Sequence, residues 1–281
     1  MDLTRAHFAF VWPVLFCTGL LLAFKNYNYF SWIYLITVAL IGLFGFEGGM
    51  VLNDIIDHKL DQLDVDNGNL TNYWRPFNER PIPSGNVSLR EAIIIFLIFV
   101  FISVLLIATL PLPNLFYIYG FMLYGYGMEI FYQIKKRNQK YPLAQLLGRT
   151  DLTFFPVAGY LCYGQFDITI LFIVLFMYPW ALAHLGANDI VDLKNDKAKD
   201  LNTVTVLYGI KNTVIWILVF SLINIGTAII FLIFQLGQIA LIGFLISFAL
   251  LIIANFYLIR KQSSEYRSRT WSPKSFFRKE Y

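Results

Sequence analysis

Eight long apolar runs constrain this chain more than any other feature of its sequence. Each has 17 or more mostly apolar residues, and they lie at approximately residues 8–24, 30–52, 89–111, 114–134, 142–163, 167–189, 213–234 and 237–259. A helix needs about 20 predominantly apolar residues to cross the hydrocarbon core of a bilayer. Only 14% of the residues are charged, compared with about 25% in soluble proteins. We therefore predict an all-α, polytopic membrane protein, a helical bundle of about eight to nine transmembrane helices.

The basic residues predict the orientation of this bundle. Eight spans in series place both termini on one side of the membrane, together with the loops at 53–88, 135–141 and 190–212. All lysines and arginines lie on that side except Lys25 and Arg149. Since basic loops stay in the cytoplasm, we expect an integral cell membrane protein with both termini on the cytoplasmic side.

A nine-residue motif occurs twice, each time at the end of an apolar run. The first copy is NDIIDHKLD, residues 53–61, and the second is NDIVDLKND, residues 188–196. Four predicted spans separate the copies, so both lie on the cytoplasmic side. This spacing predicts a single domain, 1–281, built from two four-helix halves of parallel topology, 1–141 and 142–259, and a basic cytoplasmic tail, 260–281. The long connections that follow the motifs, 62–88 and 197–212, are expected to form a cytoplasmic cap over a site between the halves.

The acidic residues of each motif are expected to share one helical face. On a continuous α-helix, motif positions 0, 1, 4 and 8 fall within about a third of the circumference. These positions are Asn53, Asp54, Asp57 and Asp61 in the first copy, and Asn188, Asp189, Asp192 and Asp196 in the second. Such acids repel one another, especially near lipid, so a cation must offset their charge.

Carboxylates with no histidine or cysteine interleaved at ligand spacing select hard cations such as Mg²⁺. Mg²⁺ is typically held by one or two carboxylates together with substrate phosphates, so two facing motifs describe a clamp for a diphosphate. The alternative is a pair of solvated helix ends. We disfavour it because acids at a helix C-terminus oppose the helix dipole and because the motif occurs twice.

Several other polar residues have two interpretations. Arg80 and Lys136 can contact a phosphate or can be ordinary loop and anchor residues, and Tyr132 shares a helical face with Lys136. Arg149 and Asp151 are costly inside a membrane and are expected to face the interior. The sequence does not decide whether these two pair with each other or with the site.

The ordered combination of motifs between residues 53 and 212 resembles the UbiA superfamily of intramembrane prenyltransferases. It consists of NDxxDxxxD, then RPxPSG, a YxxxK after the fourth span, and DxxxD followed by TVTVLYG at 203–209. The resemblance implies that two Mg²⁺ ions are bound and that particular residues hold them and the diphosphate. The implied metal ligands are Asn53, Asp54, Asp57, Asp61, Asn188, Asp189, Asp192 and Asp196; the implied diphosphate contacts are Arg80, Tyr132, Lys136 and Lys194; and the acids central to catalysis are Asp54, Asp57, Asp192 and Asp196.

This resemblance predicts transfer of a polyprenyl group from an allylic diphosphate, such as geranylgeranyl diphosphate, to an aromatic or lipid acceptor through a carbocation. The expected partners are this donor, a hydrophobic or aromatic acceptor and membrane lipid, with no nucleic acid. Two alternatives stay open: a secondary transporter or cation channel, and a non-catalytic protein that binds prenyl lipids. The superfamily usually has nine spans, whereas this sequence shows eight apolar runs before its charged tail.

Overall fold

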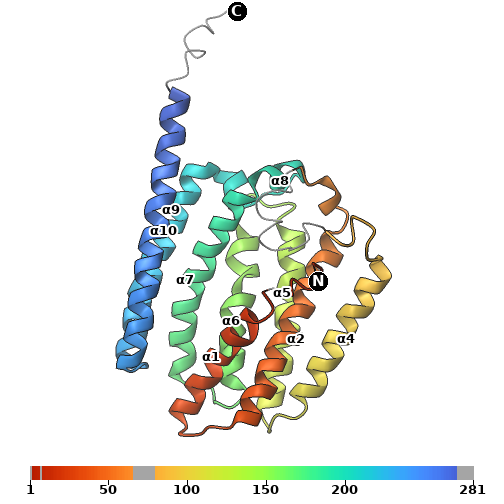
Figure 1. Ribbon diagram of the computed structural model, residues 1–281, viewed down its shortest axis with the longest axis vertical. Helices are drawn as coiled ribbons and strands as arrows, with labels where there is room; N and C mark the ends of the chain where they lie inside the picture. The colour runs from red at the N-terminus through yellow and green to blue at the C-terminus, as the bar shows by residue number, and fades with distance from the viewer. Residues whose placement is uncertain (1, 7, 66–79, 271–281) are drawn as a thin grey trace, which may run out of the picture.

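The structure is a computed structural model that describes residues 2–6, 8–65 and 80–270. Within these ranges the chain is helical and contains no strand (Figure 1). The elements in chain order are α1 (Val11–Asn26), α2 (Trp32–Asp57), η1 (Asp61–Leu63), α4 (Leu89–Ile107), α5 (Asn114–Lys135), η2 (Ala144–Gly148), α6 (Thr150–Leu161), α7 (Ile168–Val191), α8 (Leu193–Ala198), α9 (Val204–Phe234) and α10 (Gln238–Thr270).

Every predicted apolar run forms a helix, which confirms the all-α fold. Five segments in the described ranges are long and apolar enough to cross a membrane: Trp32–Asp57, Leu89–Ile107, Ile168–Val191, Val204–Phe234 and Ala240–Arg260. The fifth run is not one regular helix, because the π-helical turn η2 precedes the 12-residue α6. The protein is an integral membrane protein, and its predicted division into two halves stays a prediction.

Side-chain caps fix where three of the long helices begin. The Ser31 hydroxyl accepts a hydrogen bond from the backbone N–H of Tyr34 at the start of α2. Ser88 and Glu91 form a reciprocal capping box at the start of α4, and the Asp167 carboxylate accepts from the backbone N–H of Thr169 at the start of α7. Each cap satisfies N–H groups that have no partner within the helix.

Two glycines allow α1 and α6 to cross in backbone contact. A Cβ atom on Gly19 would lie 1.9 Å from the Pro156 carbonyl oxygen, and one on Gly159 would lie 1.8 Å from the Phe16 carbonyl oxygen. Neither position accepts any side chain without moving the backbone. This crossing joins the first predicted half of the chain to the second, as small residues commonly do between membrane helices.

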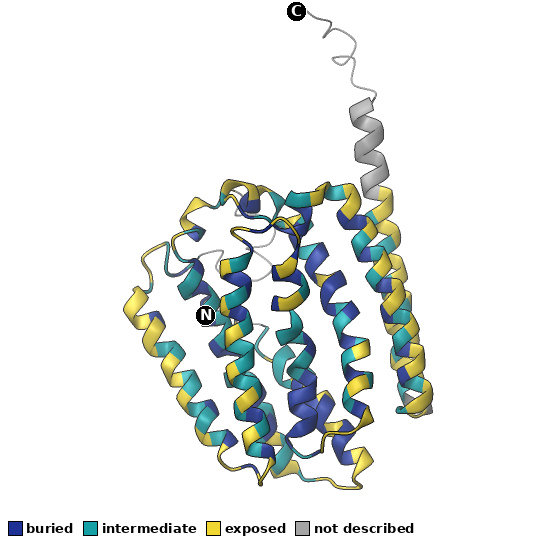
Figure 2. Ribbon diagram, turned by 180° about the vertical axis from the view of Figure 1, so that it is seen from behind, coloured by how far each residue is buried: buried dark blue, intermediate teal, exposed yellow. Residues whose placement is uncertain are grey.

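The order of neighbouring helices repeats along the chain. In the first half α1 packs on α2 and α2 packs on α4; in the second half α6 packs on α7 and α7 packs on α9. The helices α5 and α10 differ, since α5 packs on α2 and α6 within the bundle, whereas α10 lies at its edge against α9. Figure 2 shows the exposed residues along α4, α9 and α10, where apolar side chains face the surrounding lipid.

The ends of α2 and α7 lie at the same end of the bundle, beside α8 (Figure 1). At this end α9 is kinked at Gly209, whose φ is 78°. A short helical segment precedes the kink. For this reason α9 begins nine residues before the predicted apolar run. At the other end of the chain, α10 continues through Thr270 without a break at residue 260.

Candidate active site

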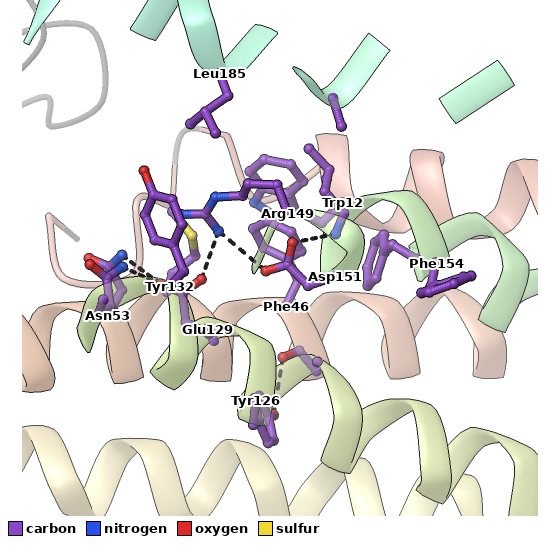
Figure 3. Close-up of a pocket in the computed structure, with 18 of the residues that line it drawn as sticks. Trp12, Phe46, Asn53, Tyr126, Glu129, Tyr132, Arg149, Asp151, Phe154 and Leu185 are labelled. Atoms are coloured by element: carbon purple, nitrogen blue, oxygen red, sulfur yellow. Dashed lines mark hydrogen bonds and ion pairs between the residues drawn. The ribbon is translucent and has the colours of Figure 1, made fainter. Parts of the chain in front are cut away.

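A cavity with a volume of about 380 Å³ lies inside the bundle. Its walls come from α1, α2, α4, α5, α6 and α7. The two acidic motifs line one end, and aromatic side chains line the other. Between them lies a cluster of buried charged residues, shown in Figure 3.

The first motif does not form one continuous helix, contrary to the expectation from the sequence. Helix α2 ends at Asp57, and Asp61 opens the separate 3₁₀ turn η1. No basic residue occupies the last turn of α2, so nothing in the helix offsets the repulsion between its acids and the negative end of the helix dipole. Asn53, Asp57 and Asp61 nevertheless line the same cavity.

Asp57 is held by two cations from the end of α5. The Lys136 ammonium lies 2.7 Å from one carboxylate oxygen, and the Arg137 guanidinium lies 3.0 Å from the other. Lys136 is itself buried. The predicted site residues Asp57 and Lys136 are therefore in direct contact.

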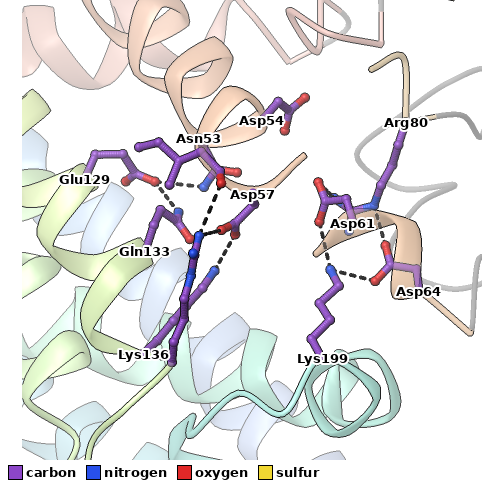
Figure 4. A network of polar contacts seen from close by, with 12 residues as sticks. Asn53, Asp54, Asp57, Asp61, Asp64, Arg80, Glu129, Gln133, Lys136 and Lys199 are labelled. Carbon is purple, nitrogen blue, oxygen red and sulfur yellow. Dashed lines mark hydrogen bonds and ion pairs between the residues drawn. The ribbon is translucent and has the colours of Figure 1, made fainter. Parts of the chain in front are cut away.

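Asp61 belongs to a second ionic group, drawn in Figure 4. Its carboxylate lies 2.6 Å from the guanidinium of Arg80 and 2.8 Å from the ammonium of Lys199. Asp64 contacts the same two cations and lies 2.6 Å from Lys199. Burial alone would raise the pKa of Asp61, but the charges of Arg80 and Lys199 outweigh it and lower the pKa below its ordinary value. The sequence predicted the position of Arg80 but gave no signal for Lys199 or Asp64.

Asp54, which was expected to bind metal, does not line the cavity. Its carboxylate lies 3.2 Å from the guanidinium of Arg5, and Figure 4 shows it directed away from Lys136. The segment before α1, which contains Arg5, folds back over α2. There Leu3 packs in a small buried cluster with Val51 and Ala92. Asp54 therefore holds the N-terminal segment in place.

The second motif, like the first, does not form one continuous helix. Helix α7 ends at Val191, Asp192 stands at the break, and Asp196 lies on the short helix α8. Asn188, Asp189, Asp192 and Asp196 all line the cavity. Burial raises the pKa of Asp192 and raises the pKa of Asp196 to about 6.

Two acids of the second motif also have local partners. The Asp189 carboxylate accepts a hydrogen bond of 3.0 Å from the backbone N–H of Val204, at the start of α9. The Thr203 hydroxyl donates to Asp196 at 2.7 Å. Asp189 is thus partly engaged in capping α9, which leaves Asp192 and Asp196 as the acids better placed to hold a ligand.

Three of the four predicted diphosphate contacts line the cavity with the motifs: Arg80, Tyr132 and Lys136. Lys194 lies on α8 and is not among the cavity-lining residues. His184 on α7 stacks on Trp180 and also lines the cavity.

The charged cluster between the two ends of the cavity answers a question that the sequence left open. Arg149 pairs with Asp151 at 3.2 Å, and also with Glu129 at 2.8 Å. Its guanidinium lies 3.7 Å from the centre of the Tyr132 ring, a cation-π arrangement. Glu129 was missed from the sequence, because it lies inside an apolar run without any motif.

Glu129 connects this cluster to the first motif. It accepts a hydrogen bond of 2.8 Å from the Asn53 amide and another from the Gln133 amide. Both Glu129 and Gln133 are buried. The cluster therefore fixes the side chain of one predicted metal ligand.

The far end of the cavity is lined by aromatic rings. Trp12 stacks on Phe46 with ring centres 3.6 Å apart, and Phe155 contacts both Phe16 and Phe46. Phe154 lies at the same end, beyond Asp151 (Figure 3). Such a wall excludes water, and the faces of its rings attract a positive charge.

The donor atoms of the two motifs suit Mg²⁺, because they are carboxylate and amide oxygens with no sulfur. Within the described ranges, no three acidic, histidine or cysteine side chains converge on one point. Binding by one or two carboxylates together with phosphate oxygens fits this arrangement better than an all-protein site.

The comparisons with known proteins agree with this architecture. The 4-hydroxybenzoate octaprenyltransferase of Vibrio parahaemolyticus is 25% identical over 283 residues, which cover 100% of this chain and 90% of that enzyme. A UbiA homolog from Aeropyrum pernix superposes with a TM-score of 0.73 at 21% identity, covering 92% of this chain and 91% of that one. A UbiA homolog from Archaeoglobus fulgidus, solved with DMAPP and Mg²⁺, superposes with a TM-score of 0.66 at 18% identity, covering 91% and 85%.

The comparison with protein-family models covers nearly the whole chain. The model of the UbiA prenyltransferase family matches residues 10–279, a range that includes both motifs and every helix from α1 to α10. The resemblance noted in the sequence is thereby confirmed. This protein is a prenyltransferase that belongs to the UbiA prenyltransferase family.

Proposed function

We propose that this protein is a Mg²⁺-dependent enzyme that transfers a polyprenyl group from an allylic diphosphate to a hydrophobic acceptor within the membrane. The proposal rests on one observation: the cavity is charged at one end and apolar at the other. Acids of both motifs and the cations Arg80, Lys136 and Lys199 line one end, while aromatic rings line the other. A prenyl diphosphate has the same division, with an anionic head and an apolar tail.

The cations at the motif end bind the diphosphate head. Arg80 offers a planar guanidinium that matches phosphate oxygens, and Lys136 and Lys199 add point charges. All three are held in position by carboxylates of the first motif and its neighbour Asp64. Their positive charge stabilises the negative charge that develops on the leaving diphosphate.

Asn53, Asp57, Asp61, Asp192 and Asp196 are the residues that would hold Mg²⁺, with one ion at each motif. When bound, Mg²⁺ neutralises the diphosphate oxygens and makes diphosphate a better leaving group. The structure of the Archaeoglobus fulgidus homolog with DMAPP and Mg²⁺ supports this choice of ion.

The chain's own residues account for the rest of the reaction. The bond between the prenyl carbon and the diphosphate oxygen breaks, and its electron pair leaves with the diphosphate. The aromatic wall around Trp12, Phe46 and Phe155 shields the allylic cation from water. A nucleophilic atom of the acceptor forms the new bond to carbon and loses a proton, so the products are prenylated acceptor, diphosphate and H⁺. No serine or cysteine nucleophile is required.

The donor is an isoprenoid diphosphate such as geranylgeranyl diphosphate, and the motif end of the cavity faces the cytoplasm, where such diphosphates are water-accessible. The basic loops at this end support that orientation. A transporter would need acids accessible from both faces, whereas the motif acids lie together at one end.

The test uses purified protein in detergent or nanodiscs with geranylgeranyl diphosphate, Mg²⁺ and a panel of acceptors, with products identified by mass. Release of diphosphate that requires Mg²⁺ is expected, together with a product that carries one prenyl group. The matched variants are Asp192→Asn at the second motif and Asp167→Asn, which makes the same change at the N-cap of α7, outside the cavity. Turnover that is unchanged in Asp192→Asn, or no consumption of any prenyl diphosphate by the wild-type protein, would contradict the proposal.

A further inference from the structure

The charged cluster around Arg149 lies beyond the motif end of the cavity, next to its aromatic wall. Its three charged members are Arg149, Glu129 and Asp151, and all line the cavity (Figure 3). Charged groups at membrane depth are costly and tend to mark a functional site. The mechanism of diphosphate ionisation does not use them, so they are available to recognise the second substrate.

Among the described residues, each cation that lines the cavity is already paired with an acid. Arg149 is paired with Glu129 and Asp151, Lys136 with Asp57, Arg80 and Lys199 with Asp61, and Arg5 with Asp54. A diphosphate with its metal can compete for the cations of the motif end. At the Arg149 cluster, two carboxylates surround one guanidinium. A second anion there would find no unpaired cation among the described residues and would be repelled by both acids.

The same cluster does offer hydrogen bonds to a neutral group. The Gln133 side chain is fully buried and lines the cavity, and its Oε1 atom has no hydrogen-bond partner among the described residues. A buried acceptor of this kind is costly unless a ligand donates to it. The hydrogen bonds of Arg149 to Glu129 and Asp151 both use Nη1, so within the described chain its Nε and Nη2 atoms keep N–H groups for a ligand.

A hydroxyl group satisfies both sides of this site. It donates a hydrogen bond to the Oε1 atom of Gln133 and accepts one from the guanidinium of Arg149. A carboxylate or phosphate has no proton to donate to Gln133 and meets the charges of Glu129 and Asp151. The rings of Trp12 and Phe46 lie beside the cluster and can contact an apolar or aromatic body (Figure 3).

We infer that the acceptor of this prenyltransferase carries a neutral hydroxyl head group and no carboxylate or phosphate, and that it binds between Gln133, Arg149 and the aromatic wall. This inference rests on the proposed function, because it concerns the second substrate of that reaction. It distinguishes this chain from the 4-hydroxybenzoate octaprenyltransferase of Vibrio parahaemolyticus, whose named acceptor is a carboxylate.

The experiment compares acceptors that differ in charge and little else. One pair is 4-hydroxybenzamide and 4-hydroxybenzoate; a second is geranylgeranylglycerol and geranylgeranylglyceryl phosphate. Each is offered with geranylgeranyl diphosphate and Mg²⁺ to the full-length protein, and kcat/KM is measured for each acceptor. The expected result is at least a tenfold preference for the neutral member of a pair that is used.

A variant tests whether the cluster causes this preference. Asp151→Asn removes one acid from Arg149 and leaves the bond between Asn53 and Glu129 unchanged, so relative use of the anionic acceptor should rise about fivefold or more. Asp167→Asn makes the same substitution outside the cavity and should leave the ratio unchanged. The ratio of two acceptors within one preparation does not depend on how much protein is correctly folded.

The outcomes separate this inference from the proposed function. Equal or better use of the anionic member of any pair overturns the inference but keeps the prenyl transfer. Mg²⁺-dependent cleavage of the diphosphate with no acceptor of either pair prenylated also overturns it. No cleavage of the diphosphate under any condition overturns the proposed function itself.

Discussion

The buried ammonium of Lys136 lies 2.7 Å from the carboxylate of Asp57, joining the end of α5 to the end of α2. Since both residues line the cavity, this ion pair belongs to the predicted diphosphate site. Replacement of Lys136 by Met should lower kcat/KM for the prenyl diphosphate at least a hundredfold, because it removes a phosphate contact and leaves Asp57 with one cation fewer.

A neighbouring lysine provides the control for this variant. Lys135 is adjacent in the chain but is not among the cavity-lining residues, so Lys135→Met should stay within about twofold of the wild type. Steady-state kinetics with varied donor concentration measure both. Equal losses in the two variants would mean that the general positive charge of this face, and not the position of Lys136, binds the donor.

Asp54 and Asp192 should behave differently, although the family resemblance implied a catalytic role for both. Asp192 lines the cavity, whereas Asp54 does not and is paired with Arg5. We expect Asp192→Ala to abolish Mg²⁺-dependent turnover. Asp54→Ala should lower activity mainly by destabilising the fold, by about 3 to 5 kcal/mol, because it leaves the buried Arg5 without this carboxylate. Thermal unfolding and activity of each variant distinguish the two effects.

The double variant Arg5→Gln/Asp54→Asn sharpens this comparison. If the pair serves only to hold the N-terminal segment, the two single changes should be non-additive in stability. A fully folded Asp54→Asn protein that has lost all turnover would instead indicate that Asp54 binds the metal, as the sequence motif suggested.

Removal of metal should stop the reaction reversibly. Excess EDTA is expected to abolish diphosphate release, and Mg²⁺ should restore it, because the oxygen donors of the motifs suit a hard divalent cation. Mg²⁺ and a non-reactive prenyl diphosphate analogue should raise the unfolding temperature more together than the sum of their separate effects, since each completes the binding site of the other. Full activity in EDTA would exclude the metal-assisted mechanism.

The crossing of α1 and α6 should not tolerate a methyl group. Gly159→Ala places a Cβ atom 1.8 Å from the Phe16 carbonyl oxygen, so the unfolding temperature and the yield of extracted protein should both fall markedly, with a loss of about 2 kcal/mol or more. Gly226→Ala on α9 is the control, because its Cβ meets nothing within 4 Å. A Gly159→Ala protein as stable as Gly226→Ala would mean that the two helices are not in backbone contact.

The fold was largely predictable because the length and apolarity of a membrane helix are visible in a single segment. Each apolar run from residue 8 to residue 259 corresponds to a helix. The boundaries were less accurate where the chain breaks its regular geometry: at Asp57, where α2 ends, at Asp192 between α7 and α8, and at Gly209 in α9. At Asp57 the end of α2 coincides with ion pairs to Lys136 and Arg137 from a distant segment, and the kink in α9 uses the positive φ of Gly209.

Site residues within a motif could be predicted from the sequence. Residues that are brought to the site only by tertiary packing could not. Asp57 and Asp54 lie about 60° apart around an α-helix, which is enough for Asp57 to line the cavity while Asp54 faces Arg5. Lys199 follows α8 and Glu129 lies within α5. Neither residue belongs to a recognisable sequence motif. The pairing of Arg149 with both Glu129 and Asp151 is likewise a property of the packed helices α5 and α6.

The two motifs are proposed to form one diphosphate site at the motif end of the cavity. The most direct test is an experimental structure of the protein with Mg²⁺ and geranylgeranyl S-thiolodiphosphate, an analogue that ionises slowly. We expect the diphosphate between the acids of the two motifs, in contact with Arg80 and Lys136, with the first isoprene units directed toward the aromatic wall. The acids are Asp57, Asp61, Asp192 and Asp196. A diphosphate bound away from either motif, or an isoprenoid tail directed away from this cavity, would contradict this proposal.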